Sequence, residues 1–195
     1  MRVVKLGGSL LGDGGWVAPF RTWLHRQSPA KNLLVVGGGE IVEHIRRIDR
    51  QAALPAATSH WLAIRAMQFN AELAAALLEE ARIVLRLEEF EQLPDDAGVC
   101  IADPWTMLRD DCRLADLPHA WSVTSDSIAA RLAAVLRAQE LVLLKSCLPP
   151  SPATREGLAA AGYVDEHFVS ALAGFGGVVR CVNLRGTSAA EKAVE

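Results

Sequence analysis

Six short apolar runs, separated by longer segments with helical character, constrain the fold of this chain most strongly. The runs are rich in Val, Ile and Leu and nearly continuous, as the strands of a parallel sheet with helices on both faces are. They occupy residues 2–6, 32–36, 82–86, 98–102, 140–145 and 178–182. Helices are predicted between them, over 16–27, 39–51, 59–80, 103–109, 126–138, 153–161 and 165–174. Such alternation predicts an α/β fold, a three-layer αβα sandwich with a mainly parallel central sheet.

Length and composition predict one domain over residues 1–195. Apolar residues make up 51% of the chain and the formal net charge is −3, so neither nucleic acid nor an anionic membrane surface is an expected partner. Met1 and Arg2 lead directly into a predicted strand, and no apolar run approaches the roughly 20 residues that span a bilayer. We therefore expect a cytoplasmic location. The spacing of the cysteines fits no zinc or redox motif and predicts reduced packing residues at Cys100, Cys112, Cys147 and Cys181.

The ends of the predicted helices carry their own signals. Ser125 or Asp126 is the expected N-cap of one helix, and Asp103 precedes Pro104 at the start of another. The C-terminal stretch reads GTSAAEKAVE, for which we expect fraying or a last surface turn.

Two of the predicted strands run directly into glycine clusters. Strand 2–6 is followed by Gly7, Gly8 and Ser9, and strand 32–36 by Gly37, Gly38 and Gly39. Glycine lets backbone N–H groups approach an anion closely, and ligands of α/β sheets bind where strands end at their carboxyl side. No GxxxxGK[ST] motif is present, and valine replaces the third glycine of GxGxxG, which excludes the two common nucleotide motifs. Two anion sites facing one crevice are predicted, with plain tight turns as the alternative.

Two of the chain's four lysines lie at the ends of apolar strands, in VVKLGG (Lys5) and LVLLKS (Lys145). A buried ammonium group needs an anionic partner, although a lysine at a strand edge can also extend to solvent. Asp126, in VTSDSIAARLA, is either a helix N-cap or the partner of both lysines. Lysines, N–H-rich loops and an aspartate together predict a phosphoryl-transfer site.

These four motifs, in this order, resemble the amino acid kinase family: VVKLGGSLL, LLVVGGGEIVEHIR, VTSDSIAARLA and LVLLKS. The resemblance implies the carbamate kinase-like fold of that family, with ATP and Mg²⁺ as cofactors and the metal bound mainly through ATP phosphates. It implies that Lys5 contacts the transferred phosphoryl group, that Asp126 organises the lysines, and that Lys145 is the second lysine or a nucleotide contact. Gly7, Gly8, Ser9, Lys145 and Ser146 would bind nucleotide phosphates, and Gly37, Gly38 and Gly39 the acceptor.

Two further stretches look like the small members that phosphorylate [5-(aminomethyl)furan-3-yl]methyl phosphate in methanofuran-type biosynthesis: SHWLAIRAMQFNAELAAALL and LPHAWSVTSDSIAA. By this resemblance His60, Arg65, His119 and Trp121 are candidates for the acceptor pocket, with packing or surface roles as the alternative. A nucleoside monophosphate, carbamate or amino-acid carboxylate is an alternative acceptor, and a non-catalytic binding or scaffolding relative is an alternative function. After Lys145 the chain departs from the family pattern, because a proline-rich stretch replaces the Asp-Gly loop of most members. The long helix at 59–80 is compatible with a homo-oligomer.

Overall fold

A computed structural model of the protein describes residues 1–12, 14–151, 153–185 and 190–194. Its centre is a seven-stranded sheet with the strand order β3-β4-β2-β1-β5-β6-β7. All neighbouring strands are parallel except β6 and β7, which are antiparallel. The strands are β1 (Arg2–Leu6), β2 (Asn32–Val36), β3 (Arg82–Val84), β4 (Val99–Ala102), β5 (Glu140–Lys145), β6 (Val178–Asn183) and β7 (Ala190–Val194).

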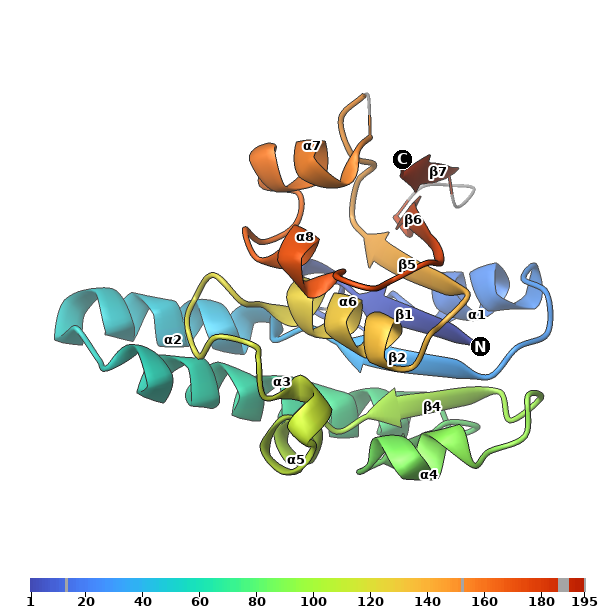
Figure 1. Ribbon diagram of the computed structural model, residues 1–195, viewed down its shortest axis with the longest axis horizontal. Coiled ribbons are helices and arrows are strands. Elements are labelled where there is room, and N and C mark those ends of the chain that lie inside the picture. The colour runs from blue at the N-terminus through green and yellow to red at the C-terminus, as the bar shows by residue number, and fades with distance from the viewer. Residues whose placement is uncertain (13, 152, 186–189, 195) are drawn as a thin grey trace.

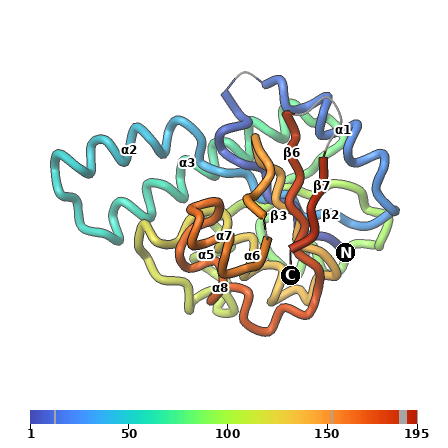
Figure 2. Tube along the Cα trace, turned by 90° about the horizontal axis from the view of Figure 1, so that it is seen from above, coloured from blue at the N-terminus to red at the C-terminus, as the bar shows by residue number. Residues whose placement is uncertain are grey.

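Helices cover both faces of the sheet, as predicted (Figure 1). They are α1 (Val17–His25), α2 (Gly39–Ala52), α3 (Ala56–Leu77), α4 (Leu87–Glu91), α5 (Pro104–Asp110), α6 (Ser125–Val135), α7 (Arg155–Ala160) and α8 (Phe168–Ala171). Both views show α2 and α3 extending together to one side of the sheet (Figures 1 and 2).

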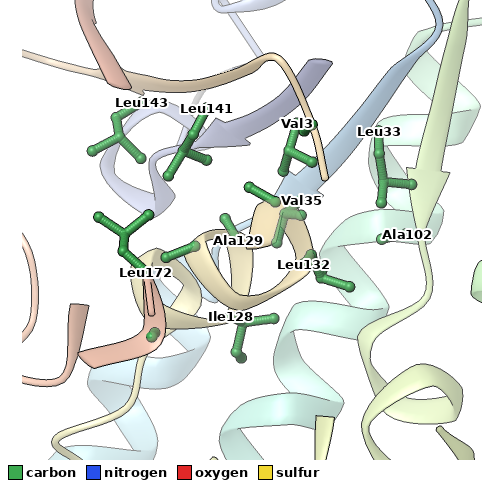
Figure 3. Close-up of a cluster of buried hydrophobic side chains, with 14 of the residues drawn as sticks. Val3, Leu33, Val35, Ala102, Ile128, Ala129, Leu132, Leu141, Leu143 and Leu172 are labelled. Atoms are coloured by element: carbon green, nitrogen blue, oxygen red, sulfur yellow. The ribbon is translucent and has the colours of Figure 1, made fainter. Parts of the chain in front are cut away.

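Alternate residues of the central strands enter two different cores, because successive side chains of a strand point to opposite faces. Val4 and Leu6 of β1 pack in one core with aromatic residues of the α1 region and with the C-terminal part of α3. Val3 lies in the other core with Leu33, Leu141 and Leu143, on the face of the sheet that α6 covers with Ala129 (Figure 3). Lys5 alternates with Val4 and Leu6, so its side chain lies on the α6 side of the sheet.

The predicted strands and helices are present, with shifts at their ends. β3 ends at Val84 rather than at residue 86, because a short helix that the sequence did not indicate, α4, follows it. The helices predicted at 153–161 and 165–174 are present as the shorter helices α7 and α8.

The N-cap of α6 is Thr124, whose side chain accepts a hydrogen bond from the Asp126 N–H, so neither Ser125 nor Asp126 has the predicted capping role. The α5 prediction is confirmed, because Asp103 caps the helix and Pro104 follows it.

Two expectations were wrong. Residues 190–194 form β7, which pairs with β6 from Ala190–Asn183 to Val194–Val179, instead of fraying or forming a turn; residues 186–189 and 195 of that stretch lie outside the described residues. Cys100 and Cys181 are buried as predicted, but Cys112 and Cys147 are exposed and are not packing residues.

Candidate phosphoryl-transfer site

The two glycine loops lie against each other, because β1 and β2 are neighbouring parallel strands whose carboxyl ends meet at one edge of the sheet. Gly8 and Gly39 are in backbone contact: a Cβ on Gly8 would lie 2.5 Å from the Gly39 nitrogen, and a Cβ on Gly37 would lie 2.7 Å from the Gly8 nitrogen. Gly39 also has a φ of +57°, which favours glycine. Packing between the loops therefore requires glycine at these positions, independently of any ligand.

Asn70 fixes the second glycine loop. Its buried side chain, on α3, donates a hydrogen bond of 2.8 Å to the Gly37 carbonyl oxygen. α2 begins at Gly39 and has 14 residues, so its first N–H groups lie at the same place. The N-terminus of a helix of this length attracts anions.

Lys5, Asp126 and Lys145 form one buried charge cluster beside these loops. The Lys5 ammonium lies 2.8 Å from Asp126 Oδ1, and the Lys145 ammonium lies 2.8 Å from Asp126 Oδ2. Lys145 also donates a hydrogen bond of 2.6 Å to the Tyr163 carbonyl oxygen. The exposed fraction is only 4% for Lys5 and 5% for Asp126, so the cluster is held in a low-dielectric environment. Residues 121 positions apart in the sequence thus meet between β1 and α6.

The pKa values of this cluster are shifted by burial and by mutual attraction. Burial lowers the pKa of Lys5 below its ordinary value of 10.5, although the Asp126 carboxylate acts in the opposite direction. Burial acts to raise the pKa of Asp126, but the attraction of Lys5 and Lys145 outweighs it and the pKa lies below the ordinary value of 3.8. Asp126 is therefore ionised at neutral pH and can hold both lysine side chains in place.

A cavity of about 1120 Å³ opens at the carboxyl ends of the strands and joins the loops to the charge cluster. Of the predicted site residues, eight line this cavity: Gly8, Ser9, Gly38, Gly39, His60, Trp121, Asp126 and Lys145. Among the described residues, the other predicted site residues lie outside its lining: Lys5, Gly7, Gly37, Arg65, His119 and Ser146.

Several of these residues still contact the cavity lining directly. Lys5 contacts Asp126. Ser9 Oγ donates a hydrogen bond of 3.3 Å to Ser146 Oγ, which places Ser146 behind the first glycine loop. The His119 ring stacks on His60 at 5.1 Å between ring centroids. These residues form a second layer around the cavity.

Arg65, predicted as a candidate for the acceptor pocket, does not line the cavity. Its guanidinium lies 3.4 Å from the centroid of the Trp105 ring and donates a hydrogen bond to Gln68, on the exposed face of α3. Helix periodicity explains the difference: Ile64 and Met67 of α3 face the cavity, and Arg65 projects from a different side of the helix.

Trp121 and His60 lie where α2, α3 and the segment before α6 meet. Trp121 Nε1 donates a hydrogen bond of 2.6 Å to Asp49 on α2, and this bond lowers the pKa of the Asp49 carboxyl. Arg46, which also lines the cavity, lies 4.9 Å from the centroid of the Trp121 ring. His60 is 4% exposed, and burial lowers its pKa, with His119 adding to the effect.

Sequence reasoning missed several residues of the site, among them Arg46 and Asp165 in the cavity lining and Asn70 and Arg185, which bind the glycine loops. Arg185 donates a hydrogen bond of 2.7 Å to the Ser9 carbonyl oxygen of the first glycine loop. Of these four, Arg46 carried a usable signal, because it stands seven positions after Gly39 on the helix that the loop begins. The others act from distant parts of the chain.

Neither a metal cluster nor a spanning helix emerges from the described residues. In that part of the chain no three His, Cys, Asp or Glu side chains gather as metal ligands. No helix there is long and apolar enough to cross a membrane.

Comparison with known proteins places this chain in a family. The sequence model of the "Amino acid kinase family" matches residues 1–147. A [5-(aminomethyl)furan-3-yl]methyl phosphate kinase of Methanocaldococcus jannaschii is 24% identical over 143 residues, which are 73% of this chain and 64% of that relative.

Solved structures of related fold cover the whole of this chain. Uridylate kinase from Archaeoglobus fulgidus is 15% identical, with a TM-score of 0.67 and 100% of both chains covered. Aspartate kinase from Synechocystis is 15% identical, with a TM-score of 0.70 over 40% of its own chain. At this identity the structures show the fold. The family match over residues 1–147 shows that the chain belongs to the amino acid kinase family.

Proposed function

We propose that this protein transfers a phosphoryl group from ATP to a small anionic acceptor. One observation carries the proposal: the buried Lys5–Asp126–Lys145 cluster stands beside two glycine loops that face one cavity. Two ammonium groups held by one carboxylate supply positive charge where negative charge develops on transferred phosphoryl oxygens.

The residues of the site fit ATP. The cavity has room for a nucleotide and an acceptor, and Gly8 and Ser9 line it from the first glycine loop beside Lys145. When bound beside Gly8, Ser9 and Lys145, ATP would supply the transferable phosphoryl group, and Mg²⁺ would add positive charge that favours the transfer. Asp126 keeps Lys5 and Lys145 oriented, and Gly38 and Gly39 present the N-terminus of α2 to an acceptor anion. An acceptor that is already anionic needs no general base, so positioning and charge supply the catalysis.

We propose [5-(aminomethyl)furan-3-yl]methyl phosphate as the acceptor and its diphosphate as the product. The identity to the Methanocaldococcus jannaschii kinase supports this choice, as does the mixed lining of the cavity. Trp121 and Met67 offer apolar surface for a flat ring, while Glu43 and Arg46 offer charged groups at the same end. The aspartate and uridylate kinases of similar fold make an amino-acid carboxylate or a nucleoside monophosphate the main alternatives.

The test is a panel of acceptors with ATP and Mg²⁺. Each acceptor is incubated with the protein at equal concentration and ADP formation is followed by a coupled assay. We expect the aminomethylfuran phosphate to give the highest kcat/KM, and UMP, aspartate and carbamate to give at most a few per cent of it. A preference for one of those three would contradict the proposed acceptor and leave the kinase activity standing.

A non-catalytic binding protein is the second candidate, because the family match ends at residue 147 and seven residues between 159 and 166 line the cavity. Calorimetry separates the two functions. A kinase binds ATP with Mg²⁺ as well as the acceptor; acceptor binding without any heat of ATP binding would favour the binding protein.

A further inference from the structure

Asp165 lies in a part of the chain that no family motif marks. It stands between α7 and α8, beyond residue 147, where the family match ends, and it lines the cavity. The surrounding stretch follows the proline-rich segment that stands where the resemblance implies an Asp-Gly loop in most members. The two carboxylate oxygens of Asp165 nevertheless reach the start of α6.

The Asp165 carboxylate accepts five hydrogen bonds. Oδ2 accepts from the Thr124 N–H at 2.9 Å, the Thr124 hydroxyl at 2.7 Å and the Ser127 N–H at 3.1 Å. Oδ1 accepts from the Ser127 hydroxyl and from the His167 N–H, the latter at 3.1 Å. Four of the five donors belong to the first turn of α6 and its cap. A carboxylate at a helix N-terminus also interacts favourably with the helix dipole, and hydrogen bonds to an ionised group are strong.

Asp126 lies between the two residues that Asp165 holds. Thr124 and Ser127 are fixed on either side of it, and the Asp126 N–H donates to the Thr124 hydroxyl. The direction of the Asp126 side chain therefore depends on a turn that Asp165 ties down. Asp126 Oδ1 lies 2.8 Å from the Lys5 ammonium and Asp126 Oδ2 lies 2.8 Å from the Lys145 ammonium. A small rotation of the first turn of α6 would therefore break both contacts.

The same stretch holds Lys145 as well. The Tyr163 carbonyl oxygen accepts from Lys145 Nζ at 2.6 Å, and the Tyr163 hydroxyl donates to the Cys147 carbonyl oxygen at 2.9 Å. Residues 163–165 thus contact the second lysine at one end and the cap of α6 at the other.

We infer that Asp165 is a positioning residue of the phosphoryl-transfer site, which fixes the first turn of α6 so that Asp126 bridges Lys5 and Lys145. The inference rests on the proposed function for its effect on turnover, but the geometry it describes can be tested without turnover. It assigns a role to a segment outside the family match.

The first experiment compares Asp165→Asn with the wild type as the complete chain. We expect kcat to fall by about ten- to a hundredfold, because small displacements of catalytic groups have effects of that size. The KM for the acceptor should change less than twofold, because Asp165 contacts neither glycine loop. The surface variant Asp116→Asn is the matched control: it removes a carboxylate that pairs with Arg131 at 3.0 Å, away from the cavity.

The second readout is independent of activity. The chain has only four lysines, so labelling the lysine ε-carbon with ¹³C gives four signals, and Lys5→Met identifies that of Lys5. The charged groups acting on Lys5 are Asp126 of α6, Lys145 of β5 and Asp165. Loss of the Asp165 charge and displacement of Asp126 both disfavour protonated Lys5, so its titration midpoint should move to lower pH in Asp165→Asn.

The outcomes separate the inference from the proposed function. A folded Asp165→Asn protein in which Lys5 titrates as in the wild type would overturn the positioning role, whether or not the wild type is active. A shifted Lys5 midpoint in Asp165→Asn, together with a wild type that phosphorylates no acceptor, would support the positioning role and overturn the kinase proposal. If Asp165→Asn does not fold, Ser127→Ala, which removes one of the five hydrogen bonds, replaces it. A smaller shift in the same direction supports the role, and an unchanged midpoint overturns it.

Discussion

Gly8 shows at the scale of a single residue why the two glycine loops tolerate no side chain. A Cβ there would lie 2.5 Å from the nitrogen and 2.9 Å from the Cα of Gly39, and neither backbone atom can swing aside as a side chain would. The loops that face the cavity are therefore in contact through their backbones.

Gly8→Ala should force the loops apart. We expect the free energy of unfolding to fall by about 1–3 kcal/mol, the usual range for overpacking, with loss of most phosphoryl transfer. Gly176→Ala is the matched control, since a Cβ at that position would meet no heavy atom of the described residues within 4 Å. Urea denaturation and the kinase assay check both variants; equal stability of the two would show that the loops can separate freely.

Lys5 should give the stability of the protein an unusual dependence on alkaline pH. Its pKa is lowered in the folded state, mainly by burial, so the unfolded chain binds more protons between that pKa and 10.5. The free energy of unfolding rises with pH across this window, because the cost of burying the charged lysine is removed.

The Lys5→Met variant lacks this pH-dependent contribution to the free energy of unfolding. We expect the wild type to gain stability relative to Lys5→Met as the pH increases toward 10.5, in denaturation curves recorded at successive pH values. Lys192→Met, on β7, controls for the general effect of removing a lysine. A wild-type advantage that is constant or shrinks with pH would contradict the assigned burial of the Lys5 charge.

At the scale of elements, helix α3 buries one of its faces against the rest of the molecule and exposes apolar side chains on another. Ile64, Met67 and Asn70 face the cavity and the glycine loop. The opposite face exposes large apolar side chains, of which Phe69 is 56% exposed; the set is Leu62, Phe69, Leu73 and Leu77. Arg65 and Glu72 flank Phe69 at nearly equal distances along the helix.

This pattern is self-complementary about Phe69. A two-fold axis at that residue would bring Arg65 of one copy near Glu72 of another, and the reverse pair would form at the same time. We expect the protein to form dimers through α3 and Phe69→Glu to give monomers in light scattering after gel filtration. Val178→Glu, at another exposed apolar residue, should leave the dimer intact. A monomeric wild type, or a dimeric Phe69→Glu protein, would contradict this expectation.

At the scale of the whole molecule, local patterns predicted the parts of the fold that depend on neighbouring residues. The continuous apolar runs predicted the six strands from β1 to β6, and the two glycine clusters marked the edge of the sheet where the cavity opens. Asp126 and the two lysines could be predicted because charged residues inside apolar segments need partners.

What could not be predicted depends on contacts between distant parts of the chain. β7 has a charged and weakly apolar sequence, and it is a strand because β6 offers a free edge. Asp165 reaches α6 from a segment with no recognisable motif. Arg65 was misplaced because the sequence did not show which face of α3 turns toward the cavity.

The most direct test of the whole account is ³¹P NMR of the purified protein with ATP, Mg²⁺ and the aminomethylfuran phosphate. We expect diphosphate signals of the acceptor to grow as ADP forms with the wild type. We also expect these signals to fall at least a hundredfold with Asp126→Asn, which leaves Lys5 and Lys145 without their carboxylate. Undiminished signals from folded Asp126→Asn, or no diphosphate from any acceptor with the wild type, would contradict this account.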